Sequence, residues 1–485
     1  MTRYVVLGLF FVGLISLASV SQAAEPLRAT QQTAVADVDT RSDELKSVHK
    51  AIWDFAEVGL DEHKSAGLLT QKLAAAGFEV KTGLANMPTA FVATYGSGKP
   101  VIGILAEYDA LPGLSQKATP DRDPVVADAP GHGCGHNALG AGALGAALAV
   151  KAAMEKHKLP GTIKLYGTPA EETLIGKVYM TLDGVFNDLD VCLHWHPSDS
   201  NEAWVSTNKA AISAKFTFHG VTAHASGSPD SGRSALDAVE LMNTGANFMR
   251  EHIKSDARVH YVITDGGGQP NVVPAKATVW YYVRSDDHND AEANFNWLRD
   301  IAHGAALMTR TKFDLQIDTD CHEVVVNRPL TDLITANFQR IAAPRFTPEE
   351  VEFARRVQAP LAAQFNRTFA TALNEEVNAA PRPEKASGST DVGDISWHVP
   401  TAGLKTTCFA ADSPGHSWQN VACVGSTIGE KGMLYAAKVL AATALDLLEQ
   451  PESVSQAKAS FTEQMKNRKY TTVIPQGQRA PLKIR

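Results

Sequence analysis

The chain has 485 residues, of which 44% are hydrophobic and 20% are charged, and its formal net charge at pH 7 is −8. A chain of this length is too long for one hydrophobic core and sufficient for two domains. The mild acidity argues against nucleic acid as a partner, and 5 cysteines are too few for a disulfide scaffold.

The first residues have the order of a secretory signal peptide. Met1-Thr2-Arg3 is a short cationic start, an uncharged apolar stretch runs from Val5 to Val20, and Ser21-Gln22-Ala23 offers small residues for cleavage. The stretch is short for a spanning helix, so an uncleaved membrane anchor is the less favoured alternative. We expect a signal peptide over residues 1–23 and a mature protein that is secreted (periplasmic in a bacterium) and not held in a membrane.

The first half of the mature chain alternates helical and strand patterns. Helical patterns occupy residues 45–55, 63–76 and 138–158, and continuous apolar runs occupy 101–106, 162–167 and 189–193. Such runs predict strands buried on both faces, and this order of elements indicates a doubly wound, mostly parallel α/β sheet. We assign residues 43–205 as the first part of a catalytic domain. Residues 25–40 are expected to be loose, and 451–485 to form an irregular extension.

The middle third, residues 206–321, changes character. Apolar and polar side chains alternate at 212–218 and 278–284, as in half-exposed strands. An amphipathic helix lies between them, with Ser234 as its expected cap. We expect an inserted α+β domain here, after which the catalytic domain resumes over 322–450.

Side chains of the types that bind metals recur along the chain, and Glu171, Glu172, His194 and His196 lie just after predicted strands. The full set is Cys134, His136, Glu171, Glu172, His194, His196 and His416. Thiolate, imidazole and carboxylate ligands with one spare carboxylate suit a metal-dependent hydrolase. Neighbouring side chains on an extended segment point to opposite sides, so one of Glu171 and Glu172 can bind metal while the other faces water. Ligands gather at the carboxyl ends of such strands. An odd number of cysteines in an exported protein leaves at least one without a disulfide partner, and metal binding by Cys134 would explain one unpaired thiol. Whether Cys408 pairs with Cys423 is left open.

Five short motifs together resemble a known family. They are Gly131–Asn137, Pro169–Glu172, Ala223–Ala225, Asn271–Pro274 and Ser389–Asp394. They resemble the metallopeptidase and amidohydrolase family of glutamate carboxypeptidase, aminoacylase and hippuricase, and most closely the branch that contains one of the subunits of aminobenzoyl-glutamate hydrolase. The resemblance covers nearly the whole mature chain. It implies a catalytic domain that holds two divalent metal ions, Mn²⁺ first and Zn²⁺ second, and an inserted lid domain that mediates dimerisation.

The resemblance also implies a metal-binding role for particular residues. It makes Cys134 the ligand that bridges the two metals and makes Asp109 the carboxylate that orients a ligand histidine. Glu171 would be the general base that takes a proton from a metal-bridging water. The further ligands are His136, Glu172, His196 and His416. His194 is the alternative to His196, because one branch of the family has its ligand histidine three residues before a proline and another has Trp-His-Pro.

The lid domain supplies a second set of expected residues. By the resemblance, His224 reaches across the dimer and polarises the scissile carbonyl. Asn271 and Arg284 would hold the carboxylate of the substrate, a task that suits the forked guanidinium. The simpler alternatives are a surface-loop role for His224 and a surface ion pair for Arg284.

The sequence therefore predicts an exported metal-dependent amidohydrolase. Its substrate would be a small-molecule amide, either an N-acyl or N-aroyl amino acid of the aminobenzoyl-glutamate type or a small dipeptide. We expect a homodimer formed through the lid domain, with a heteromer as a second arrangement. Two alternatives are a subunit that is active only with a homologous partner chain and a non-catalytic exported binding protein.

Overall fold

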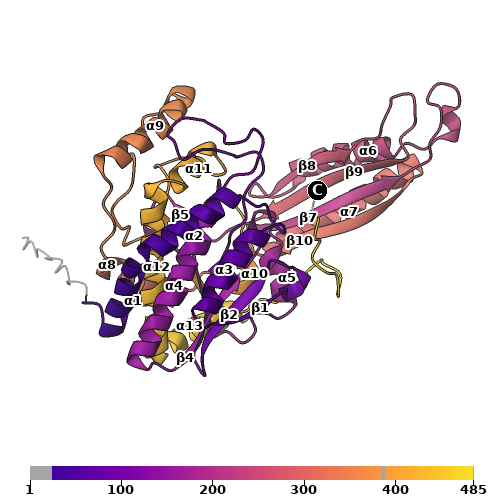
Figure 1. Cartoon of the computed structure of the whole chain (residues 1–485). Coiled ribbons are helices and arrows are strands. Elements are labelled where there is room, and N and C mark those ends of the chain that lie inside the picture. The colour runs from indigo at the N-terminus through magenta and orange to yellow at the C-terminus, as the bar shows by residue number, and fades with distance from the viewer. Residues whose placement is uncertain (1–24, 384–387, 484–485) are drawn as a thin grey trace, which may run out of the picture.

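A computed structural model describes residues 25–383 and 388–483 of the chain. The expected signal peptide, residues 1–23, lies outside the described residues. The described chain forms a large α/β part and an elongated sheet with two helices that projects from it (Figure 1).

The large part is built on a seven-stranded sheet in the order β1-β2-β4-β3-β5-β11-β6. Its strands are β1 (Glu79–Thr82), β2 (Phe91–Ser97), β3 (Val101–Ala106), β4 (Gly161–Gly167), β5 (Val191–Ser198), β6 (Glu202–Trp204) and β11 (Thr401–Thr407). The central strands β4, β3, β5 and β11 are parallel, whereas β1, β2 and β6 pair antiparallel at the two edges. This topology confirms the predicted doubly wound, mostly parallel sheet.

Helices surround this sheet. The long ones are α1 (Ala29–Thr40), α2 (Ser42–Phe55), α3 (His63–Ala75), α4 (His136–His157), α8 (Arg328–Arg340), α9 (Pro348–Phe365), α12 (Thr427–Glu449) and α13 (Pro451–Met465). The short ones are α5 (Gly176–Leu182), α10 (Val392–Ser396) and α11 (Trp418–Val424), with the single turns η1 (Leu84–Asn86), η2 (Glu171–Thr173), η3 (Pro229–Ser231) and η4 (Arg250–His252).

The sheet separates two hydrophobic cores. Successive side chains of a strand point to opposite faces, so Ile102 and Ile104 of β3 join the core under α4, whereas Val101 and Leu105 join the core on the other face. The small residues of α4 allow close packing, since a Cβ on Gly142 would stand 2.7 Å from the ring of Trp195. Among the described helices only α4 is long and apolar enough to cross a membrane, and 89% of that stretch is buried inside the protein.

Both ends that were expected to be irregular contain a helix. The prediction for residues 25–40 was wrong, because α1 packs on the core through Ala34, Val38 and a buried amide. The side-chain nitrogen of Gln31 donates to Asp446 (3.0 Å) and Asn337 (3.2 Å). A helix held by a buried amide has little of the apolar periodicity on which sequence patterns depend. The prediction for 451–485 was wrong over α13 and correct over residues 466–483, while residues 484–485 lie outside the described chain.

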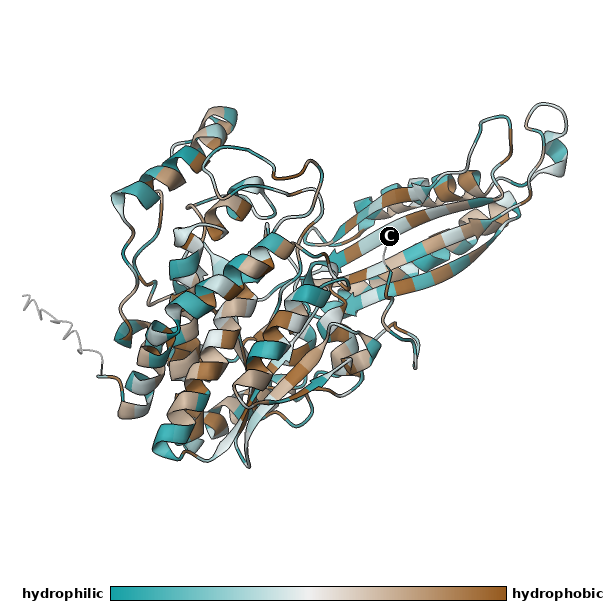
Figure 2. Ribbon diagram, in the orientation of Figure 1, coloured by the Kyte–Doolittle hydropathy of each residue, from teal (hydrophilic) through white to brown (hydrophobic). Residues whose placement is uncertain are grey.

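The projecting part is a four-stranded antiparallel sheet in the order β10-β7-β9-β8. Its strands are β7 (Ala210–His219), β8 (Arg258–Asp265), β9 (Lys276–Ser285) and β10 (Lys312–Cys321), and its helices are α6 (Ala235–Met249) and α7 (His288–Thr309). Apolar and polar residues alternate most regularly along β7 and β10 (Figure 2). The hydroxyl of Ser234 accepts from the amide of Asp237 and caps α6, as expected. We call this part, residues 210–321, the lid.

Candidate active site

The carboxyl ends of the parallel strands meet at one edge of the sheet, and most predicted site residues gather there. They are Asp109 after β3, Glu171 and Glu172 in η2 after β4, His196 within β5, Cys134 and His136 at the start of α4, and His416 in the loop before α11. An edge of this kind is where doubly wound sheets bind their ligands.

Two groups of potential metal ligands share Cys134. One consists of Cys134, His136 and His196, and the other of Cys134, Glu172 and His416, with all ligand atoms of a group within 4.8 Å of one another. The thiol sulfur lies 3.3 Å from Nε2 of His196. A thiolate common to two groups has the placement of a bridging ligand.

Hydrogen bonds orient the imidazole rings toward the shared thiol. Oδ1 of Asp109 lies 2.8 Å from Nδ1 of His136, and the Pro197 carbonyl lies 2.6 Å from Nδ1 of His196. A proton on each Nδ1 leaves both Nε2 atoms free to bind a metal ion. The other oxygen of Asp109 accepts from the backbone amide of Glu172 (2.9 Å).

His194 lies apart from these groups. It is buried on the same side of β5 as His196. Its ring centre lies 5.3 Å from that of Trp204, and the ring packs against Gly403. Burial lowers the pKa of His194 to about 3. Among the described residues, the ligand groups include His196 and not the alternative His194.

The backbone around the two glutamates is a tight turn rather than an extended segment. Glu171 and Glu172 lie in η2, between Ala170 (φ 57°) and Leu174 (φ 59°) in the left-handed region. The expectation of an extended segment was wrong, and both side chains approach the ring of His136, with Glu171 3.8 Å and Glu172 3.9 Å from its nitrogens. Non-glycine residues in this region are uncommon and recur at functional sites.

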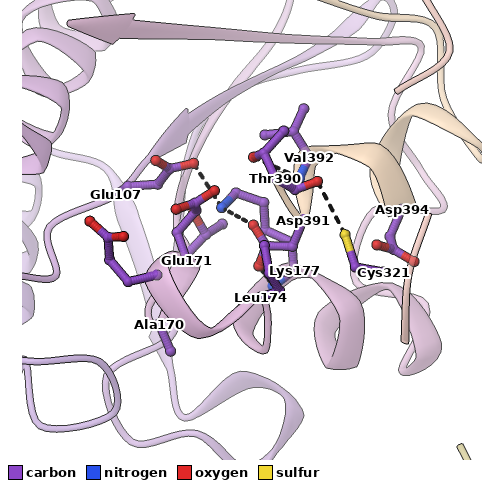
Figure 3. Close-up of polar contacts among 12 residues, drawn as sticks. Glu107, Ala170, Glu171, Leu174, Lys177, Cys321, Thr390, Asp391, Val392 and Asp394 are labelled. Atoms are coloured by element: carbon purple, nitrogen blue, oxygen red, sulfur yellow. Dashed lines mark hydrogen bonds and ion pairs between the residues drawn. The ribbon is translucent and has the colours of Figure 1, made fainter. Parts of the chain in front are cut away.

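Three buried charged residues at the site were missed by the sequence reasoning (Figure 3). Nζ of Lys177 lies 2.8 Å from Oε1 of Glu107 and 2.6 Å from Oδ1 of Asp391, and all three side chains are buried. Oδ2 of Asp391 also accepts from the Lys177 amide. The available signals were the position of Glu107 directly after an apolar strand, the single lysine of the apolar helix α5, and the place of Asp391 within the Ser389–Asp394 motif.

Burial shapes the protonation of the catalytic glutamate candidate. It raises the pKa of Glu171 well above the usual range, and the neighbouring carboxylate of Glu107 raises it further, against the opposing charge of His136. Burial likewise raises the pKa of Glu172 to about 8, again against His136. A raised pKa makes the ionised carboxylate a stronger base, which suits a group that takes up a proton during a reaction and then returns it.

The donor set fits divalent cations. Within the described chain, His136 Nε2, Glu107 Oε2 and Glu172 Oε1 are buried without a hydrogen-bond partner. Several carboxylates converge on the same small space, and that charge needs compensation in a buried site. Thiolate, imidazole and carboxylate are ligands that Zn²⁺ accepts, and ligand type alone does not select between it and Mn²⁺.

The lid residues divide into two sets. His224 and Asn271 are exposed in loops at the end of the lid sheet remote from the catalytic domain, where His224 forms a bridge with Val272. The structure does not bring them to Cys134 within this chain. Burial lowers the pKa of His416, and the charges of His136 and then of Arg284, which lies near the other end of β9, lower it further.

A cavity of about 520 Å³ opens beside Glu172. Its walls come from three parts of the chain, and they include Val58, Leu111 and Pro112 of the catalytic domain, Trp280 of the lid, and Leu482 and Lys483 of the C-terminal tail. This size and mostly apolar lining are typical of small-molecule sites.

Fold and site together define a hydrolase of the metallopeptidase class, with a doubly wound catalytic domain and an inserted lid. The chain belongs to peptidase family M20/M25/M40, which matches residues 103–446. Membership of this family makes the protein a hydrolase of amide bonds and confirms the enzyme class and family resemblance predicted from the sequence.

Individual relatives cover most of the chain. One of the subunits of the p-aminobenzoyl-glutamate hydrolase of Escherichia coli (strain K12) is 42% identical over 82% of this chain and 87% of its own length. The Xaa-Arg dipeptidase of Mus musculus is 29% identical over 91% of this chain and 94% of its own. Among solved structures, a dinuclear metal-binding peptidase of the M20 family from Bacillus subtilis shares the fold, with a TM-score of 0.55 and 17% identity over 85% of this chain and 99% of that one.

Proposed function

We propose that the protein hydrolyses the amide bond of N-acyl or N-aroyl amino acids of the aminobenzoyl-glutamate type, or of small dipeptides, with two divalent metal ions and with Glu171 as the general base. The observation that carries the proposal is the position of Glu171, a buried carboxyl group outside the two Cys134-centred groups and 3.8 Å from the ring of His136. The E. coli relative, which is named for such a substrate, supports this class.

The residues of the chain divide the chemistry between them. Cys134, His136, His196, Glu172 and His416 would hold the two ions. When bound, divalent cations supply Lewis acidity that polarises an amide carbonyl and makes water more acidic. Glu171 takes the proton of the attacking water and delivers it to the leaving amine. Asp109 keeps His136 in the tautomer whose Nε2 faces the site.

The shape of the site supports an acyl amino acid as substrate. The cavity beside Glu172 has an apolar wall that suits an aromatic acyl group. Arg284 suits the carboxylate of the amino acid, because its guanidinium stacks on Tyr282 (5.4 Å) and its Nε is buried without a partner in the described chain. Nη1 of Arg284 donates to the hydroxyl of Ser389 (3.2 Å), and this hydrogen bond fixes the orientation of the guanidinium group.

The remote His224 supports a dimer in which each site uses a histidine of the second chain. The loops that carry His224 and Asn271 project away from their own catalytic domain (Figure 1). The homodimer is our first proposal. A heteromer with a homologous chain is the second, because the E. coli relative is named as one subunit of its enzyme. We also propose export through the signal peptide of residues 1–23, with Mn²⁺ preferred over Zn²⁺.

The deciding experiment is release of free amino acid by the purified mature chain. It uses aminobenzoyl-glutamate, hippurate and dipeptides, each with Mn²⁺ or Zn²⁺. We expect metal-dependent release, and a loss of about 10²–10⁴-fold in Glu171→Gln with metal binding retained. No release by a chain that binds metal would favour the obligate-partner subunit or the binding protein. Amino-terminal sequencing of the protein from a periplasmic fraction tests the export, and cleavage after Ala23 is the expected result.

A further inference from the structure

Glu107 occupies a position at the metal site that hydrogen bonding does not explain. It directly follows β3, its residue is 3% exposed, and its Oε2 lies 3.2 Å from Nε2 of His136. Both atoms are buried, and neither has a hydrogen-bond partner in the described chain. Two polar atoms that lie this close without a hydrogen bond between them are placed like two ligands of one metal ion.

The spacing matches that of the other ligand pairs. Sγ of Cys134 and Nε2 of His196 are 3.3 Å apart, as are Nε2 of His416 and Oε2 of Glu172. Ligands bound about 2.1 Å from one cation stand about 3.0–3.4 Å apart at the angles of octahedral and tetrahedral coordination. Glu107 and His136 also form a potential ligand group with Glu171, within 4.8 Å.

A buried lysine determines which oxygen of Glu107 is free. Lys177 takes Oε1 in an ion pair of 2.8 Å, and Asp391 fixes Lys177 through both its ammonium and its backbone amide (Figure 3). Only Oε2 of Glu107 therefore remains available to bind a cation. Because all three side chains are buried, the carboxylate cannot turn away into water.

We propose that Glu107 is a further metal ligand, which binds through Oε2 the cation that His136 also holds. The inference rests on the metal dependence proposed above. Lys177 and Asp391 are positioning residues in this arrangement, since they touch neither the cation nor the substrate. The competing arrangement is a simple ion pair between Glu107 and a protonated His136, with no bond from Glu107 to metal.

Cobalt titration of the metal-free full-length protein tests the proposal without an activity readout. Co²⁺ absorbs visible light with a spectrum that depends on its ligands, so each site can be followed separately. We expect two equivalents to bind to the wild type. A His136→Ala variant identifies the site to which His136 contributes. In Glu107→Gln we expect that site to bind Co²⁺ at least about tenfold more weakly and to change its spectrum, while the second site keeps its own spectrum.

Two more variants separate ligand loss from damage to the fold. Glu107→Asp keeps a negative charge beside Lys177, but its shorter side chain moves the carboxylate oxygen away from the proposed cation. It should lower the Co²⁺ affinity of the same site. Asp190→Asn is the matched control. Asp190 is a buried carboxylate that pairs with Lys99 and Lys458, and it lies just before β5, at the end of that strand remote from His196. Unchanged affinity and spectrum in both Glu107 variants would overturn the assignment. Failure of the wild type to bind Co²⁺ would instead count against the proposed function itself.

Discussion

Asp109 joins His136 to the turn that carries the two glutamates. Its Oδ1 lies 2.8 Å from Nδ1 of His136, and its Oδ2 accepts from the amide of Glu172 at 2.9 Å. Burial opposes the charge of this carboxylate, yet His136 and the amide of Glu172 lower its pKa. One ionised side chain thus positions ligands from α4 and from the loop after β4, which are far apart in sequence.

We expect Asp109→Asn to weaken metal binding about 10–100-fold, because the amide can leave Nε2 of His136 protonated and unable to bind metal. Competition with a coloured chelator measures the affinity, and Asp190→Asn serves as the control. Affinity equal to that of the wild type would show that the ring keeps its orientation without this bond.

Glu62 should make stability depend on pH. Burial, with the charge of Asp109, raises its pKa from 4.5 to about 8. The folded protein therefore holds this proton more tightly than the unfolded chain, so its stabilising contribution is full below about pH 4.5 and is lost as the pH rises towards 8. The limiting slope is about 1.4 kcal/mol per pH unit. In urea unfolding of the metal-free protein between pH 5 and 8, Glu62→Gln should reduce the slope of the unfolding free energy against pH. An equal slope in the wild type and the variant would contradict the role given to Glu62.

Trp280 should set the preference for aromatic acyl groups. Its ring lines the cavity beside Glu172, and its Nε1 donates to Ser213 Oγ (2.7 Å), which holds the ring in place. We expect Trp280→Ala to lower kcat/KM for aminobenzoyl-glutamate by about 10–100-fold relative to acetyl-glutamate. Phe365→Ala, on the exposed face of α9, is the control. An equal loss for both substrates would assign Trp280 to lid stability instead.

Mixed dimers should reveal a site shared between chains. Glu171→Ala and His224→Ala are each expected to be inactive alone, because each homodimer lacks one group at every site. After mixing and subunit exchange, a heterodimer has one site with both groups intact, and activity should return to roughly a quarter of the wild-type value. No recovery in a sample that forms heterodimers by mass spectrometry would place His224 outside the reaction.

Local patterns were sufficient for much of the fold. The continuous apolar runs that became β3, β4 and β5 and the alternation in β7 and β9 have periods that one chain segment reveals by itself. The helix α1 was missed because its burial depends on Gln31 meeting Asp446, a contact between the two ends of the chain. The turn η2 was missed because it rests on left-handed backbone at Ala170, which is not a residue that favours this conformation.

The sequence by itself determined the class of chemistry, because Cys134, His136, the glutamate pair and His416 are recognisable by residue type and motif. Only the tertiary structure decided that Cys134 is shared by two ligand groups, that His196 rather than His194 lies in them, and that Glu107 is held there by Lys177 and Asp391. The physical reason is that a ligand is defined by the direction of its atoms. Direction depends on hydrogen bonds and ion pairs between residues that lie up to hundreds of positions apart, which no local pattern records.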